Sequence, residues 1–243
     1  MDLKQKLLLL LSGGAQSYAA KAAGYGDLLF HWPLDEASGT TATNLGSVAS
    51  ANGTYSASDI AGAATGPDGG NAPLFVPADN DKVDIHSTAF ASNWPTNGEL
   101  SVGFFMSPRN ASVWTDGTGR YLFRVFTNSN NSMQCWKVTN STIRIRYEAN
   151  NIIKEVNQGS LSSTGWLHFM ATVSLSNDRL RFYYNGSQVG SDVTGLGAWS
   201  GQPISAAIGA LPSGVTPWDG SEREFLIYGK ELPAAAVADL ATI

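Results

Sequence analysis

Two glutamates near the C-terminal end of the chain have a spacing that suits a carboxylate pair. Glu222 and Glu224 are two residues apart in a segment that alternates like a β-strand, so we expect both side chains on one face of a sheet. Retaining glycoside hydrolases use two carboxylates about 5 to 5.5 Å apart. This pair is therefore the basis of a hydrolase hypothesis.

The sequence lacks the other common catalytic patterns. No Gly-x-Ser-x-Gly elbow occurs, and Cys135 is the only cysteine, within a strand-like segment. His31, His86 and His168 do not have metal-ligand spacing. His168 is expected on a sheet face with its ring hydrogen-bonded. We therefore predict no metal site and no cofactor, and no internal disulfide is possible.

Three tryptophans in loop-like segments are candidates for binding sugar rings. Trp114, Trp199 and Trp218 have polar residues nearby, and exposed aromatic rings offer flat platforms with polar neighbours. The predicted glycan site comprises Trp114, Asp116, Trp199, Gln202, Trp218 and Asp219. The alternative is that these tryptophans close the ends of the fold or fill a subunit interface.

The elements that would position these residues are strands. Between Gly165 and Gly190, Leu167, Phe169, Ala171 and Val173 alternate with more polar residues, and Asn185-Gly186 predicts a type I′ hairpin turn. Further strands are expected at 28–35, 74–76, 83–85, 100–106, 121–126, 133–138, 142–147 and 152–156. In 142–147, the two arginines, Arg144 and Arg146, face away from the apolar residues. Residues 57–72 predict a surface loop, and 233–242 a short helix.

Several motifs resemble the laminin-G-like, concanavalin A-like jelly roll family. Trp166, His168, Leu180, Tyr183 and Asn185-Gly186 have its spacing, and three other segments agree in order: HWPLDEASGTTA (31–42), LSVGFFMSP (100–108) and WDGSEREFLIYGKEL (218–232). The resemblance covers residues 28–243. It implies an all-β fold, a two-sheet antiparallel β-sandwich with a short N-terminal helical arm and a short C-terminal helix.

The resemblance also carries expectations about sites. It implies that Trp32 and Trp166 are buried. Hydrolases of the family have a third alternating acid, whereas Gly220 and Leu226 flank the glutamates here, so we expect no enzyme. Many relatives hold structural calcium, but the corresponding positions are Asn44 and Arg223. Our hypothesis is that Arg223 replaces the ion by pairing with Glu36 or Glu224; the alternative is that it points to solvent.

Residues 1–27 differ in composition from the rest of the chain and predict a helical docking arm. Its apolar face comprises Leu3, Leu7, Leu10 and Leu11. The run of five leucines is short for a signal peptide and for a membrane span. The arm is expected to pack either on its own domain, residues 28–243, or on a neighbouring subunit, because a short leucine-rich helix is marginal in isolation.

Composition narrows the function classes. The 243 residues suit one large β domain. A formal net charge of −5 gives a nucleic acid no electrostatic attraction. Because phages display laminin-G-like domains on capsids and tails, the resemblance implies a non-catalytic structural or attachment protein of a larger assembly. The expected form is a homo-oligomeric phage virion component, a capsid decoration or tail protein, located in a virion or extracellular surface assembly. The alternative is a lectin-like module that binds a surface glycan.

Overall fold

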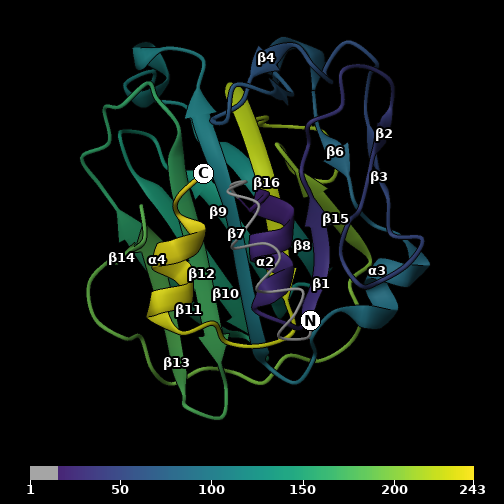
Figure 1. The fold of residues 1–243 in the computed structure, drawn as a ribbon. Helices are drawn as coiled ribbons and strands as arrows, with labels where there is room; N and C mark the ends of the chain where they lie inside the picture. Colours follow the sequence, from purple (N-terminus) through teal and green to yellow (C-terminus); the bar gives the residue numbers. More distant parts are fainter. Residues whose placement is uncertain (1–15) are drawn as a thin grey trace.

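Two antiparallel sheets packed face to face form the molecule (Figure 1). The computed structural model describes residues 16–243, and within these residues six strands form one sheet and eight form the other. Sheet A consists, in spatial order, of β1 (Leu28–Trp32), β16 (Gly220–Tyr228), β7 (Glu99–Pro108), β12 (Leu167–Ser174), β13 (Arg179–Tyr184) and β14 (Ser187–Gln188). Sheet B consists of β11 (Ile152–Gln158), β10 (Ile143–Ala149), β9 (Asn131–Lys137), β8 (Arg120–Asn128), β15 (Ser205–Ile208), β6 (Val83–Asp84), β3 (Gly53–Tyr55) and β2 (Thr41–Ala42).

Short elements complete the fold at the ends of the sheets and over sheet A. They are α2 (Tyr18–Gly24), α3 (Thr88–Asn93), α4 (Ala234–Leu240), the 3₁₀ turns η1 (Pro77–Asp79) and η2 (Ala111–Trp114), and a hairpin of β4 (Ala64–Thr65) and β5 (Asn71–Ala72). The sequence prediction of a two-sheet sandwich with short terminal helices is confirmed.

The segment from Gly165 to Gly190 forms the strand pair that its alternation predicts. Phe169 pairs with Tyr184 in the β12–β13 ladder, and Asn185 and Gly186 both have positive φ, 46° and 78°, as a type I′ turn requires. One predicted strand, 74–76, is reduced to a single bridge between Phe75 and Gly220. Prolines at 73 and 77 flank it and have no N–H to extend a ladder.

Aromatic side chains fill the space between the sheets. Phe225 of β16 stacks on Phe104 of β7 at a centroid distance of 5.8 Å, and Phe123 of β8 meets Phe225 edge-on at 5.2 Å. Phe30 and Trp32 are parallel at 5.5 Å on β1. Such pairs add about 0.5–1.5 kcal/mol beyond the burial of their area, so this layer is a principal source of stability.

Two helices cover the outer face of sheet A, as Figure 1 shows. Tyr18 of α2 donates a hydrogen bond to the carbonyl oxygen of Leu240 in α4 at 3.0 Å, and Tyr228 of β16 donates to Ala22 at 2.9 Å. A second apolar cluster lies beneath them: Ala22, Leu28, Met170, Tyr183, Leu226, Tyr228, Leu232, Ala236, Val237 and Leu240. Residues 18–24 therefore pack on their own domain.

The apolar face predicted for the arm, Leu3, Leu7, Leu10 and Leu11, lies outside the described residues. None of the helices in residues 16–243 has the length and apolar composition that crossing a bilayer demands.

On the outer face of sheet A, His168 is buried in an environment that does not satisfy its polar ring. Its ring is buried, tilted against Phe105 at 4.8 Å, and neither ring nitrogen has a hydrogen-bond partner among residues 16–243. The expectation of a hydrogen-bonded ring is therefore wrong. Desolvation by burial lowers the pKa of His168 from 6.5 to about 3, because a protonated imidazole loses its hydration there.

This burial predicts a loss of stability in acid. A lowered pKa in the folded state means that the unfolded chain binds a proton first, so stability is fully present above pH 6.5 and falls as the pH drops toward 3. The free energy of unfolding should decrease by at most about 1.4 kcal/mol per pH unit from this group. Urea unfolding between pH 4 and pH 8 should show a shallower decrease for His168→Leu than for the wild type. His86→Leu, at an exposed histidine, is the control, and identical pH profiles for His168→Leu and wild type would contradict the argument.

Candidate functional site

The three tryptophans of the predicted glycan site are not exposed. Trp114, Trp199 and Trp218 have exposed fractions of 1%, 5% and 0%, so the expectation of a tryptophan rim is wrong. Each indole N–H donates to a backbone carbonyl, those of Ser163, Gly201 and Ser107 respectively. The loops that carry them fold inward because a large apolar ring gains more from the core than from water.

The polar members of the predicted site are separated from one another. Asp116 pairs with Lys137 at 2.7 Å and with Arg120 at 2.6 Å, and these hydrogen bonds, together with that from the Thr118 N–H, lower its pKa against the opposing effect of desolvation. Asp219 pairs with Arg109 at 2.7 Å. Gln202 is exposed, in a segment without regular secondary structure. A glycan role for these three residues remains a prediction.

The two glutamates of the hydrolase hypothesis face opposite sides of sheet A. The register of β16 with β7 shifts between Arg223 and Leu226, and Glu224 has a φ of 53°, so a β-bulge interrupts the alternation. Glu222 lies opposite Met106 and points into the core, whereas Glu224 turns outward and contacts His31 Nε2 at 2.6 Å. The expectation that they share a face is wrong, and no catalytic pair forms between them.

Glu222 is buried without a hydrogen-bond partner for either oxygen within residues 16–243. Desolvation raises its pKa well above the usual range, which keeps the carboxyl protonated. A neutral acid enclosed in the core has no route to a substrate, so it is a structural residue.

Arg223 is buried at the same bulge and holds a loop against sheet A. Its guanidinium lies 3.2 Å from Glu224 Oε1 and 3.2 Å from Asp68 Oδ2, and it donates to the carbonyl of Asn71. The hypothesised pairing with Glu224 is therefore present, and the solvent-facing alternative is wrong. Glu36 instead accepts from Thr43 and Tyr55.

Asn44, at the calcium position that the resemblance implied, makes hydrogen bonds within its own loop. The side chain of Asn44 accepts from the His31 N–H at 2.8 Å and donates to the Val48 carbonyl at 2.7 Å, so it holds a turn. Among residues 16–243 no three His, Cys, Asp or Glu side chains are grouped as metal ligands. That Arg223 replaces an ion remains a hypothesis.

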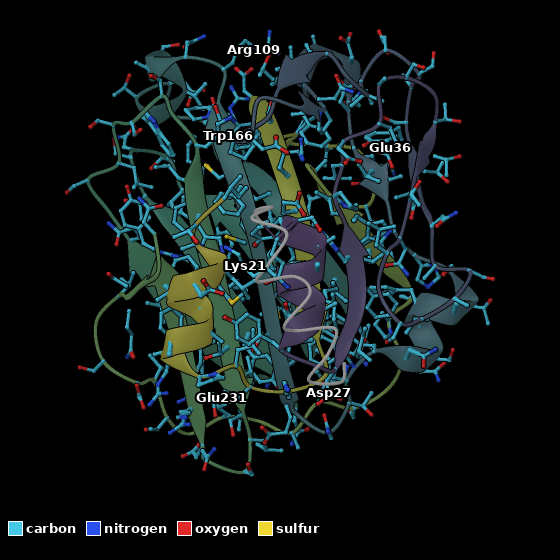
Figure 2. The ribbon with its side chains drawn as sticks, viewed as in Figure 1. Lys21, Asp27, Glu36, Arg109, Trp166 and Glu231 are labelled. Atoms are coloured by element: carbon cyan, nitrogen blue, oxygen red, sulfur yellow. The ribbon has the colours of Figure 1, made fainter. Side chains whose placement is uncertain are left out.

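Trp166 is partly exposed, contrary to the burial that the resemblance implied. It lies beside the β4–β5 hairpin, where its indole N–H donates to the Thr65 carbonyl at 3.3 Å (Figure 2). The hairpin adds a short ordered element within the predicted loop 57–72. Trp32, Trp94, Trp114, Trp199 and Trp218 are buried, which leaves Trp136 and Trp166 as the tryptophans with accessible rings.

The outer face of sheet B carries the most promising group of side chains. Trp136 of β9 lies opposite Tyr121 of β8 and opposite Arg144 of β10. The Trp136 and Tyr121 rings are stacked at 5.9 Å, and the guanidinium groups of Arg144 and Arg146 each lie 5.4 Å from the Trp136 ring. All four are partly exposed. We call Tyr121, Arg124, Phe126, Gln134, Trp136, Arg144 and Arg146 the aromatic face.

The arginines beside Trp136 are held by one acidic residue. Glu155 of β11 lies 2.6 Å from Arg146 Nε and 3.3 Å from Arg144, and Asn157 accepts from Arg144 at 2.7 Å. Sequence alternation correctly placed both arginines opposite the apolar side of 142–147. It could not reveal Trp136 and Tyr121 as neighbours, because cross-strand register is decided by the fold.

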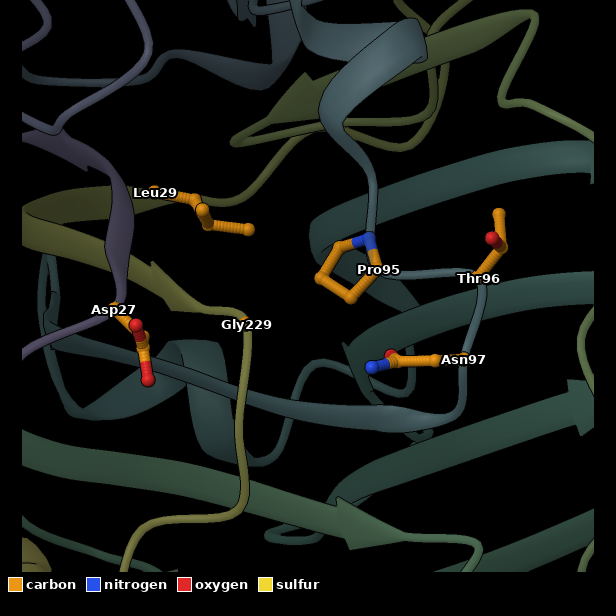
Figure 3. A pocket seen from close by; sticks show the side chains of 6 residues that line it. All are labelled: Asp27, Leu29, Pro95, Thr96, Asn97 and Gly229. Atoms are coloured by element: carbon orange, nitrogen blue, oxygen red, sulfur yellow. The ribbon is translucent and has the colours of Figure 1, made fainter.

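A pocket of about 280 Å³ lies at one end of the sandwich (Figure 3). Its lining residues are Asp27, Leu29, Pro95, Thr96, Asn97 and Gly229. It contains no aromatic side chain, and its volume is slightly below the roughly 300–1,000 Å³ of typical small-molecule sites. It is therefore the weaker candidate.

Comparison with known proteins supports the fold. A family model described as the concanavalin A-like lectin/glucanases superfamily matches residues 77–238, more than half of the chain. No curated protein matches the sequence.

Two solved structures with a similar fold are distant in sequence. Domain 4 of the Geobacillus stearothermophilus extracellular arabinanase AbnA, in complex with arabinotriose, has a TM-score of 0.57 and 17% identity, over 89% of this chain and 98% of that domain. The Ruminococcus gnavus sialidase CBM40 bound to α2,3-sialyllactose has a TM-score of 0.54 and 10% identity, over 66% of this chain and 91% of that one.

This chain matches only part of a larger solved structure. The receptor-binding domain of botulinum neurotoxin mosaic serotype C/D has a TM-score of 0.60 and 11% identity, over 89% of this chain, and the chain spans 51% of it. At these identities the likenesses show the fold alone.

Replacing Arg223 should destabilise the domain far more than replacing a surface arginine. In Arg223→Met the buried Glu224 loses a partner and the hairpin loses its anchor, so the free energy of unfolding should fall by about 3–5 kcal/mol. Arg181→Met, which breaks an exposed pair with Asp192, should cost at most about 1 kcal/mol. Urea unfolding measures both, and equal losses would show that the Arg223 cluster is not a structural anchor.

Proposed function

Because the chain belongs to the concanavalin A-like lectin/glucanases superfamily, we propose that it is a non-catalytic carbohydrate-binding module. The observation that carries this proposal is the aromatic face, where Trp136 and Tyr121 are accessible between charged side chains on a rigid sheet. This was the alternative in the sequence analysis, and it now has more support than the assembly role.

The aromatic face has the two kinds of group that recognise a sugar. Trp136 and Tyr121 offer apolar surface against which sugar C–H groups pack. Arg144 and Arg146 offer N–H donors for hydroxyl oxygens, and their pairing with Glu155 fixes their positions before a ligand arrives. Preorganised side chains lose less conformational entropy on binding, so a shallow face suffices for moderate affinity.

The structural neighbours support the same function class. An arabinanase domain is in complex with arabinotriose, and a sialidase module is bound to sialyllactose. A glycan ligand would suit an extracellular or surface location. The absence of a shared face for Glu222 and Glu224 argues against the hydrolase hypothesis.

A second candidate is a building block of a larger assembly, such as a virion component. Ile152 and Ile153 on β11 are 39% and 47% exposed, and β11 is an edge of sheet B. An exposed apolar edge strand is a template for pairing with another chain. The leucines of residues 1–15 would add to such an interface.

Replacing Trp136 should weaken glycan binding without unfolding the domain. A glycan array would identify a ligand, and calorimetry should show a loss of affinity of at least about tenfold for Trp136→Ala. Trp166→Ala, at the other partly exposed tryptophan, is the matched control and should bind as the wild type does. Circular dichroism checks folding. Unchanged binding by a folded Trp136→Ala variant would exclude this face, and no binding by the wild type would reject the proposed function.

The assembly candidate predicts self-association through β11. Analytical ultracentrifugation of the full chain should show oligomers that Ile153→Lys converts to monomers, because a charge on the edge opposes strand pairing. Deleting residues 1–15 tests the arm in the same assay. A wild-type chain that stays monomeric at high concentration would refute a homo-oligomer.

A further inference from the structure

Arg124 is the unpaired cation of the aromatic face. Its guanidinium lies 4.5 Å from the Phe126 ring on the same strand. Arg144 and Arg146 share Glu155, and Arg120 pairs with Asp116, but Arg124 makes no ion pair within residues 16–243, and its buried Nε has no hydrogen-bond partner there. Partial desolvation of a cation without a counter-charge is unfavourable. An anion bound to Arg124 would offset that cost.

The side chain of Gln134 is a second, independent indication of a polar ligand at this point. It lies directly opposite Arg124 on the neighbouring strand β9. Its side chain is 5% exposed, and its Oε1 has no hydrogen-bond partner in the described part of the chain. Buried polar groups are satisfied in the great majority of cases. Two unsatisfied groups on adjacent strands of one face therefore point to a polar ligand.

The strand on the other side of Arg124 offers it no counter-charge. Ala207 of β15 lies opposite Arg124, and Asp84 of β6 follows on the next strand. Two strand spacings place Asp84 roughly 10 Å from Arg124, and Lys82 lies 3.9 Å from its carboxylate. Asp84 is thus next to Lys82 and forms no ion pair with Arg124 within residues 16–243.

We infer that the glycan carries a carboxylate, as uronic and sialic acids do, and that Arg124 binds it. This inference rests on the proposed function. The planar guanidinium donates two parallel N–H bonds to a carboxylate, while Gln134 Oε1 accepts from a sugar hydroxyl. Trp136 and Tyr121, on the same face, contact the apolar side of the sugar chain.

Bulk electrostatics would not produce this preference. The chain has a formal net charge of −5, so its long-range field repels polyanions. Selective binding of an acidic sugar must then depend on a local cation, and the effect of removing that cation should be specific to carboxylated ligands.

The test uses matched pairs of glycans and three variants of the full chain. Calorimetry compares sialyllactose with lactose, and oligogalacturonate with its methyl ester, which distinguishes a sialic from a uronic acid. A sulfated oligosaccharide serves as a further anion. The variants are Arg124→Gln, Arg124→Lys and, as a control remote from this face, Arg181→Gln.

The inference requires that one carboxylated glycan binds in preference to its neutral partner. Arg124→Gln should then lower the affinity for that ligand by about tenfold to hundredfold. Arg124→Lys should lose less affinity, and Arg181→Gln should bind with the affinity of the wild type. Equal binding of neutral and carboxylated partners, stronger binding of the sulfated sugar, or an unaffected Arg124→Gln variant would each overturn it while leaving the proposed function intact. Binding of no glycan at all would instead reject the proposed function.

Discussion

Aromatic contact between the two sheets is the interaction on which the rest of the structure depends. Phe104 and Phe225 of sheet A meet Phe123 of sheet B, and most of the tryptophans join the same core. Because these rings fill the space between the sheets, only the remaining aromatic rings lie on the outer faces. Trp136 is available on sheet B because its strand alternation directs it away from this layer.

The bulge in β16 shows how one local irregularity changes a chemical interpretation. A regular strand would have placed Glu222 and Glu224 side by side. The positive φ of Glu224 instead turns its carboxylate outward to His31 and Arg223, while Glu222 stays in the core as a neutral acid. The same irregularity that removes a catalytic pair creates the buried anchor for the β4–β5 hairpin.

The two outer faces of the sandwich differ in how far they are covered. Sheet A is covered by α2 and α4, which bury a second apolar cluster and so leave little of that face for a ligand (Figure 1). Sheet B carries the aromatic face with its stacked rings and arginines. A rigid sheet holds those side chains at fixed spacings, which suits the glycan binding that we propose.

The sequence by itself determined the sandwich, because period-two alternation makes each strand two-faced and Asn-Gly at 185–186 permits positive φ. It also determined that Arg144 and Arg146 point away from the core. The tertiary structure alone decided that loop tryptophans are buried, that a bulge separates Glu222 from Glu224, and that Trp136, Tyr121 and Arg124 share a face. Those outcomes depend on register and packing between residues distant in the chain, which no local pattern encodes.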